Sequence, residues 1–246
     1  MNCIVLGATK GMGRAVSRAL VARGDRLCLL GRNQEDLNRT AQDLHVRGEL
    51  TTAPETLLCD LGDPDTFSTV LDAAVTALGG VDLMVVTAAV FATQDGLDQD
   101  PGLARRLMQT NFVNTIEFCE LASQRLLSNG GGTLCVFSSV AGDRGRASAR
   151  IYGSAKAGLS TYLEALDHRY RRQGLRVLCV KPGFIRTSMT AGLAPPPFAG
   201  NADDVAGRVI RAIDRGDSVV YAPAIWRWIM LVIRLLPRFI MRRSNF

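Results

Sequence analysis

Histidine is scarce in this chain of 246 residues, which has only His45 and His168. Neither stands with cysteine or carboxylate residues at the spacing of a metal site, and both lie in helix-like surface contexts. We therefore expect no structural or catalytic metal.

The six cysteines form no paired pattern. Five lie singly inside short apolar runs of strand type, and the sixth lies in a helical segment: Cys3, Cys28, Cys59, Cys135, Cys179 and Cys119. This placement is typical of small buried side chains in a reducing compartment and argues against a disulfide framework. Residues 2–6 already resemble a buried strand, so we expect no signal peptide ahead of the fold and a cytoplasmic location.

Acidic residues are absent from residue 224 onward, where the chain carries five arginines. The net charge is +6, so the first 223 residues contribute only +1. This distribution argues against a nucleic-acid-binding body and indicates a locally basic surface element. With 47% hydrophobic and 21% charged residues, the composition is that of a globular protein.

Short apolar runs alternate with helical patterns along the whole chain. We expect strands at residues 2–6, 26–30, 56–59, 81–87, 133–138, 175–180 and 218–221. A single long helix around Asn111 is expected between the fourth and fifth strands. The alternation predicts one α/β domain over residues 1–223, built on a doubly wound parallel sheet, followed by an amphipathic helical tail over residues 224–246.

A glycine-rich turn follows the first strand. Residues 7–14 read Gly-Ala-Thr-Lys-Gly-Met-Gly-Arg and lead into a helical pattern. Glycines let the backbone approach a pyrophosphate, and a helix N-terminus favours its negative charge. A purely structural turn is the alternative. The strand-turn-helix context favours dinucleotide binding, with contacts from Gly7, Thr9, Lys10, Gly11, Met12 and Gly13.

The second strand ends without the carboxylate that usually holds the adenosine ribose hydroxyls in NAD sites. Gly31 and Arg32 stand there, and Lys10 is available in the glycine turn. Two cations and no acid fit a ribose 2′-phosphate, so we expect NADP(H) rather than NAD(H). The alternative is that Arg32 is a solvated loop residue.

Residues 152–156 read Tyr-x-x-x-Lys within a predicted helix, and Ser139 closes the strand before it. The spacing puts the phenol of Tyr152 and the ammonium of Lys156 on one helix face. A neighbouring cation favours the phenolate, so we expect the pKa of Tyr152 to fall from its usual value near ~10. A serine hydroxyl can donate to a developing alkoxide. The trio predicts proton transfer at a C–OH/C=O centre, although ordinary amphipathic helices also contain this spacing.

Two further polar residues have alternative interpretations. Asp60 ends the third strand and either accepts from an adenine amino group or caps the helix near Pro64. Asn111 either makes core hydrogen bonds or belongs to a proton relay. Residues 188–200, with three consecutive prolines, have loop composition and follow a strand end, where we expect a substrate lid.

In order and spacing, these residues resemble the short-chain dehydrogenase/reductase family over essentially the whole chain. The matching positions are Gly7, Gly11, Gly13, Asp60, Asn111, Ser139, Tyr152, Lys156 and the segment from Pro182 to Thr187. The resemblance implies that Tyr152 is the general acid/base and that Lys156 holds the nicotinamide ribose. It implies that Ser139 orients the carbonyl and that Asn111 anchors a water of the relay. It adds Leu61, Ala88, Pro182, Ile185 and Thr187 to the cofactor site, and makes a homodimer or homotetramer expected.

Two positions depart from the family pattern. Leu6 stands where a threonine usually precedes the first glycine, and Thr87-Ala88-Ala89-Val90 replaces an Asn-Asn-Ala-Gly segment. We expect the second departure to remove polar contacts from the centre of the sheet and Val90 to crowd the cofactor.

A narrower resemblance covers residues 138–156 and residues 220–237, from Val-Tyr-Ala-Pro through Leu-Leu-Pro. Both are similar to reductases of polyprenyl-phosphate sugars, such as decaprenylphosphoryl 2-keto-pentofuranose reductases. This implies a lipid-linked 2-keto sugar as substrate.

The tail itself is basic and amphipathic. As one helix, residues 224–243 would place Arg227, Arg234, Arg238 and Arg242 within a narrow arc, with tryptophans and aliphatic residues elsewhere. Arg234 and Pro237 interrupt the apolar run, so it does not reach the roughly 20 residues that span a bilayer. We expect peripheral binding to the anionic inner face of a membrane. The alternative is that the tail covers a sister subunit or the substrate site.

The sequence therefore predicts an NADPH-dependent carbonyl reductase. One alternative is a reductase or dehydrogenase for a soluble ketone, alcohol or 3-ketoacyl substrate. The other is a non-catalytic dinucleotide-sensing protein, against which the complete Asn-Ser-Tyr-Lys set argues.

Overall fold

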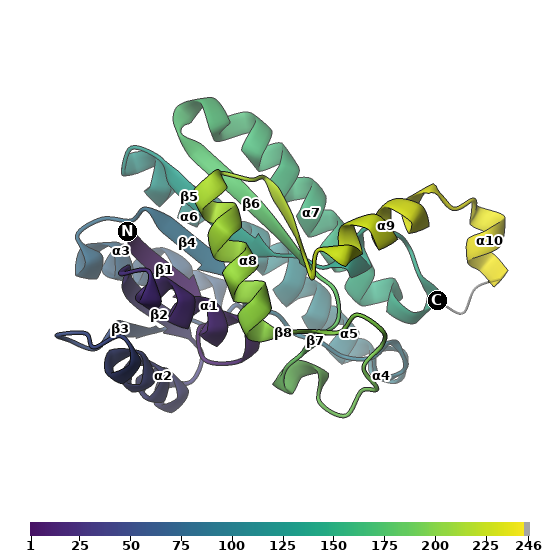
Figure 1. Cartoon of the computed structure of the whole chain (residues 1–246), viewed down its shortest axis with the longest axis horizontal. Helices are drawn as coiled ribbons and strands as arrows, with labels where there is room; N and C mark the ends of the chain where they lie inside the picture. Colours follow the sequence, from purple (N-terminus) through teal and green to yellow (C-terminus); the bar gives the residue numbers. More distant parts are fainter. Residues whose placement is uncertain (244–246) are drawn as a thin grey trace.

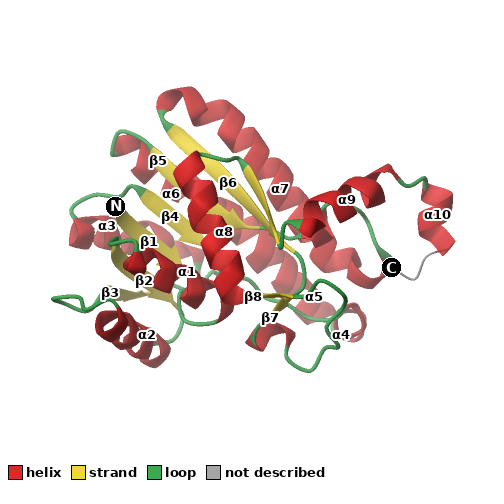
Figure 2. Ribbon diagram, in the orientation of Figure 1, coloured by secondary structure: helices red, strands yellow, loops and turns green. Residues whose placement is uncertain are grey.

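A seven-stranded parallel sheet forms the centre of the protein, as seen in a computed structural model that describes residues 1–243 (Figures 1 and 2). The strand order is β3-β2-β1-β4-β5-β6-β9. The strands are β1 (Asn2–Leu6), β2 (Arg26–Gly31), β3 (Glu55–Leu58), β4 (Leu83–Val86), β5 (Gly132–Phe137), β6 (Leu175–Pro182) and β9 (Val219–Ala222). The order reverses between β1 and β4, and ligands of such sheets bind at the carboxyl ends of the strands beside this point. The predicted doubly wound architecture is confirmed.

Helices cover both faces of the sheet. One face carries α1 (Gly11–Ala22), α2 (Gln34–Arg47) and α8 (Ala202–Arg215), and the other carries α3 (Phe67–Leu78), α6 (Thr115–Ser128) and α7 (Arg150–Tyr170). Side chains of β1 show why both layers are needed. Cys3 and Val5 enter one apolar core, whereas Ile4 and Leu6 enter the other, since successive strand residues point to opposite faces. All six cysteines are buried and free, as expected.

The long helix expected around Asn111 is interrupted. After a short α4 (Gln94–Gln99), helix α5 (Pro101–Met108) runs into a π-helical turn (Gln109–Asn114) before α6 begins. Asn111 therefore lies in wider backbone than the sequence predicted. π-turns insert one extra residue and are common at functional sites.

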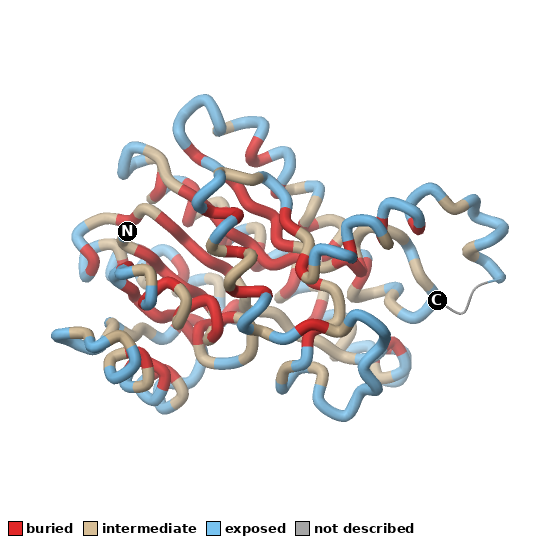
Figure 3. Tube along the Cα trace, in the orientation of Figure 1, coloured by how far each residue is buried: buried red, intermediate tan, exposed pale blue. Residues whose placement is uncertain are grey.

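The lid segment is mostly loop, as predicted. A 3₁₀ turn (Ser188–Thr190) opens it, and a two-stranded pair, β7 (Ile185–Arg186) and β8 (Gly200–Asn201), closes its base. Most of its residues are exposed (Figure 3).

The tail differs from the single helix that we expected. It consists of α9 (Ile225–Leu235) and α10 (Arg238–Arg243), separated at Leu236 and Pro237, and it extends from one end of the molecule (Figure 1). Leu236 has extended backbone, which proline after it favours. The prediction that four arginines form one continuous arc is therefore wrong, because α10 turns away from the line of α9 (Figure 1).

Candidate active site

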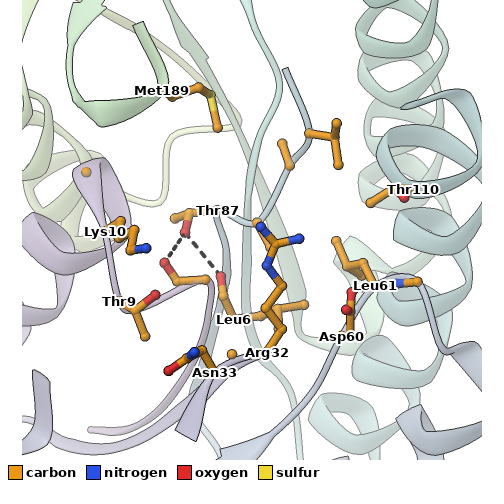
Figure 4. A pocket seen from close by; sticks show the side chains of 18 of the residues that line it. Leu6, Thr9, Lys10, Arg32, Asn33, Asp60, Leu61, Thr87, Thr110 and Met189 are labelled. Carbon is orange, nitrogen blue, oxygen red and sulfur yellow. Dashed lines mark hydrogen bonds between the residues drawn. The ribbon is translucent and has the colours of Figure 1, made fainter. Parts of the chain in front are cut away.

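A cavity of about 880 Å³ lies at the carboxyl ends of β1, β2 and β4 (Figure 4). Most of the expected cofactor contacts line it: Gly7, Thr9, Lys10, Gly11, Met12, Gly13, Arg32, Asp60, Leu61, Ala88 and Thr187. Residues scattered over 180 positions of the sequence thus meet at the point where the strand order reverses.

The glycine turn is closely packed against the end of β4. A Cβ at Gly13 would lie 2.1 Å from the Gly7 carbonyl oxygen, and one at Gly7 would lie 2.6 Å from Thr87 Oγ1. The Thr87 hydroxyl contacts the carbonyl oxygens of Leu6 and Gly7 at 3.1 Å each (Figure 4). Thr87 therefore supplies a polar contact at the sheet centre. Ala88, Ala89 and Val90 have no polar side-chain group to add to it, so the loss that we expected from this departure stays a prediction.

The start of α1 fits a phosphate group. Lys10 precedes the helix with extended backbone (φ −141°), and a lysine side chain has no acceptor that could cap the N–H groups of the first turn. The N–H groups of that turn carry partial positive charge and border the cavity. Unpaired donors, glycines and open space are what a pyrophosphate needs.

The Lys10 ammonium is not free in this structure. It lies 3.1 Å from the Asp36 carboxylate, whose pKa is lowered by the hydrogen bond and charge of Lys10. Asp36 is in the first turn of α2 and lines the cavity beside Arg32. Sequence reasoning missed this acid, although its signal was an aspartate four residues after Arg32.

Asp60 lies on the opposite wall of the cavity. Its Oδ1 accepts from the backbone N–H of Gly62 at 2.8 Å, and Asp63 precedes the 3₁₀ turn (Pro64–Thr66) instead. Capping of the helix near Pro64 by Asp60 is therefore wrong. The Leu61 carbonyl beside it accepts from Asn114 Nδ2, which ties this wall to the π-helical turn.

Tyr152, Lys156 and Ser139 meet where α7 crosses the end of β5. Ser139 follows the strand, its Oγ accepts from the Ala141 N–H at 3.1 Å, and its hydroxyl is near enough to Tyr152 to act on the pKa of that phenol. Lys156 Nζ donates to the Phe137 carbonyl at 2.8 Å and lies 5.9 Å from the centre of the Tyr152 ring. The predicted trio is thus brought together.

The electrostatics of the trio differ from our expectation. Burial raises the pKa of Tyr152 to about 12, and the hydrogen bond with Ser139 acts in the lowering direction. Burial also lowers the pKa of Lys156 to about 8, since only 2% of this residue is exposed. The expected lowering of the tyrosine pKa by Lys156 is wrong for the protein alone, because burial raises this pKa and the group that acts against burial is Ser139.

Asn111 is completely buried and pairs with the backbone of Val90. Its Oδ1 accepts from the Val90 N–H at 2.7 Å, and its Nδ2 donates to the Val90 carbonyl at 2.6 Å. The side chain thus makes the core hydrogen bonds of the first interpretation. It fixes a segment that borders the cavity at Val90 and meets the Tyr152 ring at Phe91, with ring centres 5.4 Å apart at 84°.

Comparison with known proteins identifies the fold and its chemistry. Residues 2–196 match the model of the short chain dehydrogenase family. The chain belongs to this family. A short-chain dehydrogenase is an oxidoreductase that uses NAD(P)(H), so the protein is an NAD(P)(H)-dependent short-chain oxidoreductase.

Relatives resemble this short-chain oxidoreductase over most of its length. An uncharacterized oxidoreductase of Mycobacterium tuberculosis is 31% identical over 240 residues, which is 98% of this chain and 95% of that protein. Carbonyl reductase family member 4 of Danio rerio is 32% identical over 198 residues, 78% of each chain. A solved short-chain dehydrogenase/reductase from Mycobacterium ulcerans has the same fold, with a TM-score of 0.83 at 22% identity, covering 98% of this chain and 97% of that one.

Not every predicted site residue of this short-chain oxidoreductase reaches the cavity. Six of them do not line it: Asn111, Ser139, Tyr152, Lys156, Pro182 and Ile185. Asn111 is joined to its wall by the hydrogen bonds with Val90. Sequence reasoning missed four residues of the region: Asp36, Phe91, Met189 and Trp226. Met189 lines the cavity from the lid, and Trp226 packs against Val140, the neighbour of Ser139. Trp226 had a signal as an aromatic residue at the start of the tail, and Met189 fell within the expected lid, whereas Phe91 had none.

Proposed function

We propose that this enzyme is an NADPH-dependent carbonyl reductase whose catalytic residues are Ser139, Tyr152, Lys156 and Asn111. The observation that carries the proposal is the position of Tyr152. The Lys156 ammonium lies 5.9 Å from the centre of its ring, and its ring packs on Phe91, which follows Val90 in the wall of a cavity that fits a dinucleotide. The catalytic domain comprises residues 1–223, and residues 224–246 form the tail.

The side chains of the protein supply the proton and position the substrate. When bound, the nicotinamide supplies a hydride to the carbonyl carbon. Ser139 holds the carbonyl oxygen, and Tyr152 gives that oxygen its phenolic proton, so that a ketone becomes an alcohol. A pKa of about 12 keeps Tyr152 protonated at neutral pH, which suits a proton donor. Lys156 holds the nicotinamide ribose, and Asn111 supports the proton relay through the segment at Val90.

The preference for NADPH rests on charge. Lys10 and Arg32 border the cavity where β2 ends in Gly31, so two cations and no strand-end carboxylate are available to an adenosine 2′-phosphate. Asp36 opposes this preference because it competes for Lys10.

The substrate that we propose is a 2-keto sugar on a polyprenyl phosphate, reduced at the inner, cytoplasmic face of a membrane by a homodimer or homotetramer. The support is the tail, where exposed apolar side chains accompany five arginines and no acid. In the described part of the chain, no helix is long and apolar enough to cross a membrane, so the attachment that we propose is peripheral.

A second candidate is the reduction of a soluble ketone or 3-ketoacyl thioester, with the tail serving oligomerisation. The specific observation in its favour is the 32% identity to carbonyl reductase family member 4 of Danio rerio. That similarity covers 78% of each chain, and the name of the relative mentions a carbonyl substrate and no lipid.

The test is NADPH oxidation by the purified protein against two substrate sets. The first is a membrane lipid extract oxidised to carry 2-keto polyprenyl-phosphate sugars, and the second is a panel of soluble ketones and 3-ketoacyl thioesters. We expect turnover with the lipid set, and a lower rate with NADH. Turnover confined to the soluble set would overturn the lipid substrate and leave the reductase, and cofactor binding without turnover in either set would overturn the reductase.

A further inference from the structure

Exposed apolar side chains are concentrated in two segments near the candidate active site. Among residues 1–243, fifteen large apolar residues are exposed, and ten of them lie in the lid or the tail. These ten are Met189, Leu193, Phe198, Ile225, Trp228, Leu231, Val232, Leu235, Phe239 and Ile240. Such a concentration marks an interaction surface, since isolated exposed apolar residues are normal but clusters are not.

The base of the lid and the start of the tail lie side by side. A Cβ at Gly200, the end of the lid, would lie 2.8 Å from Pro223 Cγ, two residues before α9. A Cβ at Gly183, just before the lid, would lie 2.1 Å from Trp226 Nε1 in the first turn of α9. Met189 belongs to both the exposed set and the wall of the cavity. The apolar surface therefore adjoins the rim of the proposed substrate site.

Helix α9 has two apolar faces with different roles. Trp226, Met230 and Ile233 are buried and pack toward Val140, whereas Trp228 and its neighbours point to solvent. The Arg144 guanidinium also donates to the Leu236 carbonyl at 2.8 Å. Because the inner face and the C-terminal end of α9 are held on the body, its outer face is displayed in a fixed position.

The charge of the surface selects its partner. Residues 188–200 carry no charged side chain, and residues 224–243 carry five arginines and no acid. In the tail, the Arg227 guanidinium lies 5.8 Å from the centre of the Trp228 ring, a pair suited to the boundary between lipid headgroups and acyl chains. Anionic headgroups complement this charge, whereas a two-fold contact between copies would bring arginines together.

We propose that the lid (residues 188–200) and the outer face of α9 and α10 form one docking surface for an anionic lipid bilayer, which we name the rim surface. This inference rests on the proposed membrane attachment of the tail and adds the lid as its second half. The substrate entrance then faces the lipid, and a lipid-linked carbonyl substrate reaches the cavity without leaving the bilayer.

The experiment is sedimentation of the full chain with phosphatidylglycerol vesicles. One variant combines Trp228→Ser and Leu235→Ser on the tail, and another combines Leu193→Ser and Phe198→Ser on the lid. The matched control is Val46→Ser, because Val46 is 66% exposed on α2, away from both segments. We expect each double variant to weaken vesicle binding about tenfold or more and the control to bind within twofold of the wild type. Phosphatidylcholine vesicles and added salt should weaken wild-type binding.

Thermal unfolding and NADPH binding verify that each variant is folded. The proposal would be overturned if the lid variant bound vesicles as strongly as the wild type does. It would also be overturned if the wild type bound phosphatidylcholine vesicles as strongly as phosphatidylglycerol vesicles. A third result would also overturn it: the wild type does not bind vesicles, and the tail variant differs from it only by a loss of self-association in sedimentation velocity. NADPH oxidation of a soluble ketone is measured in parallel on the wild type, because it tests the proposed reductase activity independently of any lipid.

Discussion

The two ends of the candidate active site are built on different physical principles. At the nucleotide end, the charged groups are on the surface and pair with one another, as Lys10 does with Asp36 at 3.1 Å. At the end formed by β5, α7 and α9, Lys156 is buried and donates to the Phe137 carbonyl, and Ser139 and Tyr152 are half-buried.

This difference separates selectivity from catalysis. Water screens surface charges, so changes at the nucleotide end should alter cofactor preference by small factors. Buried groups are desolvated and packed, so changes at the other end should have large effects on turnover and stability. The predictions below test this contrast, from the largest expected effect to the smallest.

The largest effect is expected for Tyr152→Phe. Removal of the phenolic proton donor should lower kcat about 10²- to 10⁴-fold, while the Kd for NADPH stays within twofold. Steady-state NADPH oxidation and fluorescence titration measure the two quantities. A kcat within tenfold of the wild type would show that the buried end does not carry the chemistry.

The two tryptophans of α9 should differ in their effect on stability. Trp226 is 8% exposed in the core that covers Val140, whereas Trp228 is 63% exposed. We expect Trp226→Ala to lower the free energy of unfolding by about 3–5 kcal/mol and Trp228→Ala to change it by less than about 0.5 kcal/mol. Urea denaturation measures both. Equal losses would mean that the inner and outer faces of α9 are not distinct.

Lys156 should make stability depend on pH. Burial lowers its pKa to about 8 in the folded chain from 10.5, so the unfolded chain binds more protons between these values. The cost of burying the ammonium is present below about pH 8 and is relieved as the pH rises toward 10.5. Relative to Lys156→Met, the wild type should gain about 1–3 kcal/mol of unfolding free energy from pH 7 to pH 10.

Urea denaturation of both proteins at the two pH values measures this gain. The comparison cancels most of the titration of thiols and phenols that the two chains share. A difference between the two proteins that does not change with pH would show that the Lys156 ammonium is not desolvated.

The smallest effect is expected at Asp36. Asp36→Asn should release Lys10 and lower the Kd for NADPH about two- to fivefold, with no change in the Kd for NADH. Glu35→Gln is the matched control, because Glu35 lies in the same turn of α2, is exposed and does not line the cavity. If both variants changed the Kd for NADPH and for NADH equally, the effect of Asp36 would be that of any nearby negative charge and not of its pairing with Lys10.

Much of the fold could be predicted from local patterns. The alternation of apolar runs and helices gave all seven strands of the sheet within three residues at each end, since buried strands are necessarily apolar. The start of the tail helix was equally visible. Its end was not, because whether Pro237 kinks a helix or separates two depends on packing of α9 against the body.

The parts of the candidate site that could be predicted are those in which a sequence motif brings its own residues together. Tyr152 and Lys156 share a helix, and the glycine turn follows a strand, so their neighbours could be inferred. Asp36 was missed because its role depends on how α2 packs beside the turn. Trp226 was missed because an amphipathic pattern does not tell which of two apolar faces becomes buried.

The sequence alone determined the parallel sheet, the family and the chemical groups available, because periodicity and spacing are local properties of the chain. Only the tertiary structure decided the electrostatic state of those groups and the partners they have. It paired Lys10 with Asp36, directed Lys156 to the Phe137 carbonyl and placed the Thr87 hydroxyl against the Gly7 carbonyl. Desolvation and pairing depend on atoms brought together from distant positions, which no local pattern specifies.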